Sequence, residues 1–102
     1  MRRLILTAMA RDDLQQIARF IARDNPVRAK SFVGELRRQC ELLLEQPVLG
    51  VSQEDCAKGL RRISHGSYLI FYCQVENDIR IERVLHGARD IGRLFESSTN
   101  NH

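Results

Sequence analysis

The chain has 102 residues, of which 43% are hydrophobic and 28% are charged, and its formal net charge is +3. These values fit one globular domain and exclude a disordered chain, and the mild charge gives no reason to expect direct, sequence-independent binding to nucleic acid. The three widely spaced cysteines predict reduced thiols, with no disulfide framework, metal site or cofactor. No apolar run approaches the roughly 20 residues that cross a bilayer, so we expect a soluble, cytoplasmic protein with no membrane partner.

The N-terminal half predicts one strand followed by two helices. Residues 3–7 (RLILT) form a short β-type run. The next segment carries apolar residues at the helical spacing i, i+3, i+4, i+7, namely Leu14, Ile17, Ala18 and Ile21. We place Asp12 and Asp13 on the polar side of this helix, in its first turn, where the helix dipole favours acids.

A second helix follows almost at once. Asn25 is suited to cap it and Pro26 to occupy its first turn. The Gln46-Pro47 step ends it, because the residue before a proline avoids the helical conformation. Between these limits runs one long apolar stripe, made of Ala29, Phe32, Val33, Leu36, Cys40, Leu43 and Leu44. The short connection predicts that the two helices form an antiparallel hairpin.

After a loop over residues 47–59, the pattern changes from helical to alternating. This change predicts three antiparallel strands, over residues 60–64, 67–75 and 79–86. His65 and Gly66 are expected to form a tight turn between the first two strands. The predicted fold is therefore α+β, in the order β-α-α-β-β-β, with the helical hairpin packed on one face of a small antiparallel sheet.

The strand over residues 67–75 has two different faces. Its odd positions Leu69, Phe71, Cys73 and Val75 are all apolar, so we expect them to meet the helices. The even positions Tyr68, Ile70 and Tyr72 are then predicted to lie on the open face of the sheet, as an amphipathic patch for a partner.

The last strand leads into a C-terminal segment. Gly87 is expected to break the strand, and Asp90 to cap a short terminal helix that contains Ile91, Leu94 and Phe95. We assign residues 1–96 to a single domain and residues 97–102 to a flexible tail.

These segments, in this order, resemble the ParE-like branch of the RelE/ParE toxins of bacterial toxin-antitoxin systems. The resemblance is carried by LILTAMARDDLQQIARFIA, DNPVRA, CELLLEQPVLG, GLRR, GSYLIFY and RVLHGARD. It implies a toxin that inhibits DNA gyrase by binding it and that a ParD-like antitoxin neutralises. In such systems the toxin contacts DNA only indirectly, through the antitoxin complex. The alternative that the superfamily offers is a RelE-type, ribosome-dependent mRNA endonuclease.

The residues themselves allow both a binding and a catalytic interpretation. A ribonuclease that works without a metal needs acid-base groups and cations near the phosphate, and His86, Tyr72, Arg61 and Arg83 are the candidates. No aromatic hydroxyl follows Tyr72, whereas RelE-like ribonucleases tend to carry an acid-base group near the C-terminus. We therefore favour a protein with no catalytic residues, in which His86 ends the strand and donates to a carbonyl.

For partner binding we single out residues of the open sheet face and of the C-terminal segment, namely Arg61, Tyr68, Ile70, Tyr72, Arg89, Leu94 and Phe95. Arg61 and Arg62 are adjacent in a strand, so their side chains leave on opposite faces. Arg83 interrupts the apolar alternation of the last strand. Either a bulge shifts the phase there, or Arg83 is partly buried and paired with one of Asp78, Glu82 and Asp90.

Overall fold

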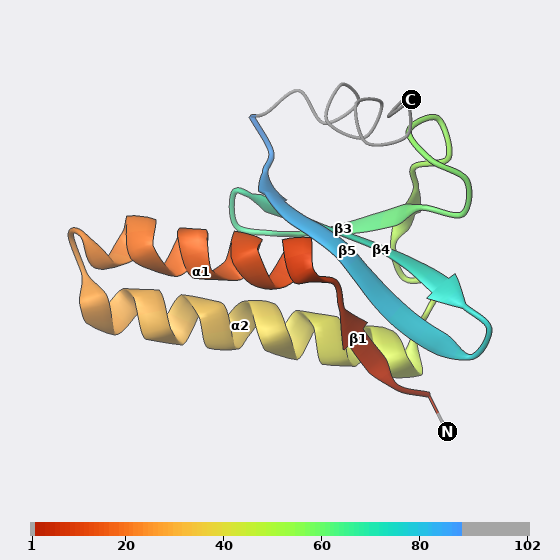
Figure 1. Cartoon of the computed structure of the whole chain (residues 1–102), viewed down its shortest axis with the longest axis horizontal. Helices are drawn as coiled ribbons and strands as arrows, with labels where there is room; N and C mark the ends of the chain where they lie inside the picture. The colour runs from red at the N-terminus through yellow and green to blue at the C-terminus, as the bar shows by residue number, and fades with distance from the viewer. Residues whose placement is uncertain (1, 89–102) are drawn as a thin grey trace.

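The structure, a computed structural model, describes residues 2–88 (Figure 1). Its elements in chain order are β1 (Leu4–Leu6), α1 (Ala8–Ala22), α2 (Pro26–Glu45), β2 (Val51–Ser52), β3 (Arg61–His65), β4 (Tyr68–Val75) and β5 (Asp78–His86). The predicted terminal helix with Ile91, Leu94 and Phe95, like the predicted tail, lies outside the described residues.

The two helices form an antiparallel hairpin that covers one face of the sheet (Figure 1). Asn25 caps α2 as predicted, since its side-chain oxygen accepts from the backbone N–H of Arg28 at 3.0 Å. Thr7 caps α1 in the same way through the N–H of Ala10. Because this cap starts α1 at Ala8, the placement of Asp12 and Asp13 in the first turn was wrong.

The sheet has five strands in the order β1-β5-β4-β3-β2, and it is mixed rather than antiparallel. The strands β2 to β5 pair antiparallel, but β1 pairs parallel with β5, with Leu4 opposite Ile79. The whole helical hairpin separates β1 from the rest of the sheet, so no tight turn forces it to run antiparallel to its neighbour. The strand β2, in the segment expected to be a loop, adds a short edge.

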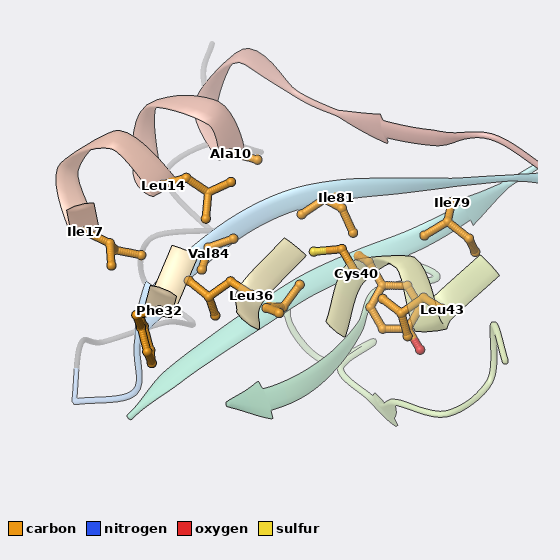
Figure 2. Packing of buried hydrophobic residues seen from close by; sticks show 12 residues of the cluster. Ala10, Leu14, Ile17, Phe32, Leu36, Cys40, Leu43, Ile79, Ile81 and Val84 are labelled. Carbon is orange, nitrogen blue, oxygen red and sulfur yellow. The ribbon is translucent and has the colours of Figure 1, made fainter. Parts of the chain in front are cut away.

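The main core lies between the helices and the sheet (Figure 2). It combines Ala10, Leu14 and Ile17 of α1, Phe32, Leu36, Cys40 and Leu43 of α2, and Ile79, Ile81 and Val84 of β5. Ile70 and Tyr72 of β4 belong to the same cluster, and both are fully buried.

The predicted assignment of the two faces of β4 was therefore inverted. The even positions face the helices, and the odd positions Leu69 and Phe71 face the opposite side. There they pack with Leu60, Leu85 and residues of the 53–60 loop in a second, smaller cluster. Because the loop buries this side too, both faces of β4 are apolar, and alternation alone gave no means of telling them apart.

A β-bulge in β5 explains why Arg83 interrupts the apolar alternation of the last strand. Phe71 pairs with Arg83 while the next residue, Tyr72, pairs with Ile81, so Glu82 is the extra residue. The bulge is anchored to the start of α1, since the Thr7 hydroxyl donates to the Glu82 carbonyl at 2.9 Å. The predicted phase shift is thus confirmed, and it allows Ile81 and Val84 to face the same core.

Candidate functional site

The hydroxyl of Tyr72 holds the segment that follows α2. It donates to the carbonyl oxygen of Pro47 and accepts from the backbone N–H of Gly50, both at 2.8 Å. Arg61, opposite Tyr72 on β3, donates to the Gly50 carbonyl at 2.6 Å. A Cβ atom on Gly50 would lie 2.7 Å from both the Tyr72 hydroxyl and the Arg62 carbonyl, so only glycine fits.

This arrangement gives Tyr72 and Arg61 structural roles. Tyr72 has no exposed surface, and burial raises the pKa of its hydroxyl, which opposes its use as a base. The exposed position predicted for Ile70 and Tyr72 is wrong for the same reason, because both side chains lie beneath the helices.

Arg83 is paired with an acid that the sequence did not point to. Its Nε and Nη2 donate to the Asp13 carboxylate on α1 at 2.8 and 2.9 Å, and the backbone N–H of Val84 donates to the same carboxylate at 2.9 Å. The side chains of Arg83 and Asp13 are 16% and 8% exposed. The hydrogen bond to Asp13 raises the pKa of Arg83. None of the three partners predicted for Arg83 is the one observed.

Asp13 was missed although the sequence contained a signal for it. It lies three residues after Ala10 and four before Ile17, and both of these residues are buried against the sheet. An acid at such a position on a helix faces the core and requires a partner. That partner is the arginine that interrupts the apolar pattern of β5.

His86 ends β5, as predicted, and its side chain packs edge-on against Tyr68 with ring centroids 5.3 Å apart. Its Nδ1 accepts from the backbone N–H of Ala88 at 3.1 Å, so the predicted donation to a carbonyl is replaced by acceptance from an amide. The ring therefore stabilises the chain as it leaves the sheet. Among the described residues, no carboxylate forms a hydrogen bond with His86, so none orients its ring as a general base.

His65 belongs to β3 rather than to the turn, which consists of Gly66 and Ser67. Its Nε2 lies 2.8 Å from the Glu35 carboxylate of α2, and its ring lies against Phe32 with centroids 5.5 Å apart. Glu35 also pairs with Arg28, and these two partners, Arg28 foremost, lower the pKa of Glu35 to about 2. This group ties α2 to the end of β3.

The surface near His86 is hollowed between α1 and the sheet. The lining includes Ile17, Phe20, Tyr68, Leu85 and His86. Phe20 is 63% exposed. Tyr68, which was predicted to bind a partner on an open sheet face, is half-buried and lines this hollow between α1 and the sheet. The predicted partner residues Arg89, Leu94 and Phe95 lie outside the described residues.

The remaining reactive groups form no metal site in the described part of the chain. No group of three or more histidine, cysteine or acidic residues is placed to hold a metal ion within residues 2–88. All three cysteines are free thiols. Burial raises the pKa of Cys40 to about 12 and that of Cys73 to about 11, so both are protonated near neutral pH. No helix within this range has the length and apolar character needed to span a bilayer.

Comparisons with known proteins place this geometry in context. Toxin ParE1 of Caulobacter vibrioides is 36% identical over 58 residues, a match that spans 57% of this chain and 59% of that protein. A solved structure described as the chromosomal ParDE TA system from P. aeruginosa has the same fold, with a TM-score of 0.71 over 84% of this chain and 96% of that one. The sequence identity to that structure is 20%.

The family match extends further along the sequence. Residues 4–91 match the family described as the ParE toxin of the type II toxin-antitoxin system, parDE. This range includes both helices and all five strands of the sheet. The chain therefore belongs to the ParE toxin family of type II toxin-antitoxin systems.

Proposed function

We propose that the protein is a toxin that inhibits DNA gyrase by binding it, without breaking bonds itself, and that a ParD-like antitoxin neutralises it. The family match supports the toxin function. It also favours gyrase as the target, since ParE-like members are taken to act on gyrase. On this proposal the toxin contacts DNA only indirectly, through its antitoxin complex, in line with its small net charge.

Binding is favoured over RNA cleavage because three of the four candidate catalytic groups form contacts that hold the fold together. Tyr72 and Arg61 anchor the segment around Gly50, and Arg83 neutralises Asp13. A ribonuclease needs its base and its cations free to meet the substrate. Of the four candidates, His86 alone is exposed, and within residues 2–88 it has no ion pair or hydrogen bond with a charged side chain.

Gyrase assays test the proposal directly. Purified protein is expected to inhibit supercoiling of relaxed plasmid and to increase gyrase-dependent DNA cleavage, and addition of the antitoxin should reverse both effects. Unchanged supercoiling at saturating protein would contradict the proposed target. Primer extension on translated mRNA, run with the same preparation, is expected to show no new cuts, whereas cuts at ribosome-bound codons would support the RelE-type alternative.

A further inference from the structure

A groove of about 410 Å³ lies between α1 and α2, near the end of the hairpin that extends beyond the sheet (Figure 1). Arg19, one of the residues that line it, comes two residues after the core residue Ile17 and so lies about 200° around α1 from the core. The groove therefore opens away from the sheet. Alanine side chains end at Cβ, so they leave this space open between two packed helices. The apolar lining consists of Ala18 and Ala22 of α1 and Pro26, Ala29 and Val33 of α2.

Two cations flank this apolar lining, one from each helix. They are Arg19 of α1 and Lys30 of α2, and both are exposed. Neither forms an ion pair with another described residue. Arg23, exposed one turn after Arg19, extends the positive rim on α1. Within residues 2–88 no acidic residue lines the groove, so its positive charge is available to a partner.

An amphipathic helix with a narrow apolar face and acidic flanks matches this groove. Its apolar side chains would fill the space between the two helices, as in other complexes that hold a helix in an apolar groove. Carboxylates on its flanks would meet Arg19 on one side and Lys30 on the other. A second copy of this chain fits less well, because it would place another Arg19 and Lys30 against the first pair.

We propose that this groove is the surface through which the toxin binds DNA gyrase, and that its occupant is an amphipathic helix of gyrase with acidic flanks. The inference rests on the proposed function and adds the contact surface and the chemistry of the bound segment. Hollows lined by Asp13 contain an acid that is already paired with Arg83, whereas both charged residues of the groove lack an ion pair in the described chain.

Charge reversal tests the two rims. Affinity of the full-length chain for the gyrase holoenzyme is measured by surface plasmon resonance at about 0.15 M salt. Arg19→Glu and Lys30→Glu are each expected to weaken binding by at least about tenfold, because like charges would then face each other. Lys58→Glu, which makes the same change of charge at an exposed position of the 53–60 loop, is the matched control and should change affinity less than about twofold. Affinities of Arg19→Glu and Lys30→Glu within twofold of the wild type would overturn the inference.

Ala22→Gln tests the apolar lining without any change of charge. Its longer side chain would occupy the groove, so we expect gyrase affinity to fall by about tenfold. Ala8→Gln, at the exposed first residue of α1, is the control for this substitution. Circular dichroism melts verify that each variant is folded, and Ala18→Gln replaces Ala22→Gln if the latter does not fold. Unchanged gyrase affinity of a folded groove-filling variant would contradict the proposed occupant.

The antitoxin is the alternative occupant, and the same variants separate the two partners. Loss of antitoxin affinity in variants that still bind gyrase like the wild type would assign the groove to the antitoxin and overturn the inference. If the wild-type chain does not bind gyrase at all, the proposed function fails, and with it this inference. Gyrase inhibition by the wild type that all the groove variants retain rejects the inference alone.

Discussion

Arg83 and Arg62 lie in neighbouring parts of the same sheet but in opposite surroundings. Arg83 donates two hydrogen bonds to Asp13, and the Val84 amide completes the coordination of that carboxylate. Arg62 lies on β3, which β4 separates from β5. Its Nε is buried, and no acceptor in residues 2–88 receives a hydrogen bond from it. One cation holds α1 to β5, and the other has no ion pair within residues 2–88.

The contrast separates an arginine whose charge is paired within the fold from one that has no ion pair in the described residues. A paired, buried charge is expensive to disturb, because removing either member leaves the other uncompensated. A charge without an ion pair has no such contact to lose, so its removal should leave folding nearly unchanged.

The largest effect is expected from Asp13→Ala. It leaves the Arg83 guanidinium and the Val84 amide without their acceptor, so we expect the free energy of unfolding to fall by about 3 kcal/mol. Urea denaturation followed by circular dichroism measures the change. The adjacent Asp12→Ala, at an exposed position, is the control and should cost less than about 0.5 kcal/mol. Equal effects of the two substitutions would contradict the structural role of the Asp13 pair.

A smaller loss is expected from Tyr72→Phe, which removes the anchor of the segment around Gly50. The buried Gly50 amide would lose its acceptor, at a cost of about 1.5 kcal/mol. Tyr68→Phe is the matched control, since no hydrogen bond of the Tyr68 hydroxyl is found among the described residues, and it should leave stability within about 0.5 kcal/mol. The same denaturation experiment compares the two, and an unaffected Tyr72→Phe would show that the anchor is dispensable.

A smaller contribution to stability, and one that depends on pH, is expected from the pairing of Glu35 with Arg28 and His65. These side chains are more exposed than the Asp13–Arg83 pair. The folded state lowers the pKa of Glu35 from 4.5 to about 2, so its contribution is fully present above pH 4.5 and is lost as the pH falls toward 2. The stability difference between wild type and Glu35→Gln should therefore shrink over that range. Thermal melts from pH 6 to pH 2 measure it, and a difference that stays constant would argue against the lowered pKa.

The smallest effect on folding is expected from Arg62→Met. This side chain has no described ion pair to lose, so stability should change by less than about 0.5 kcal/mol. Arg83→Met, measured in parallel, should cost far more because it leaves Asp13 buried and unpaired. A loss for Arg62→Met as large as that for Arg83→Met would remove the distinction between the two arginines.

Local signals predicted most of the fold. The Asn25-Pro26 start and the Gln46-Pro47 end of α2 were both confirmed, because caps and prolines act within a few residues. The predicted strand, two helices and three strands were confirmed in their order, with β2 added in the segment predicted as a loop. The parallel pairing of β1 and the inverted faces of β4 were not predicted, since each depends on segments distant in the sequence, such as the loop that covers Phe71.

The candidate site was less accessible to sequence reasoning. Arg83 attracted attention because it broke a pattern, yet its partner Asp13 is 70 residues away. From the sequence, Tyr72 was a candidate proton-transfer group and a candidate partner-binding residue on an open sheet face. Only its contacts with Pro47 and Gly50 identify it as an anchor. Arg62 was noted only as the neighbour of Arg61 on the opposite face of a strand, because the lack of a hydrogen-bond partner at its Nε is visible only in three dimensions.

The central claim is that the protein acts by binding and that its candidate catalytic groups serve the fold. Expression of His86→Ala in growing cells tests this most directly, because His86 is the exposed candidate whose removal leaves the buried network intact. We predict growth inhibition equal to that of the wild type, with no mRNA cuts from either protein in primer extension. Loss of toxicity in a folded His86→Ala variant, together with mRNA cuts by the wild type alone, would contradict the claim.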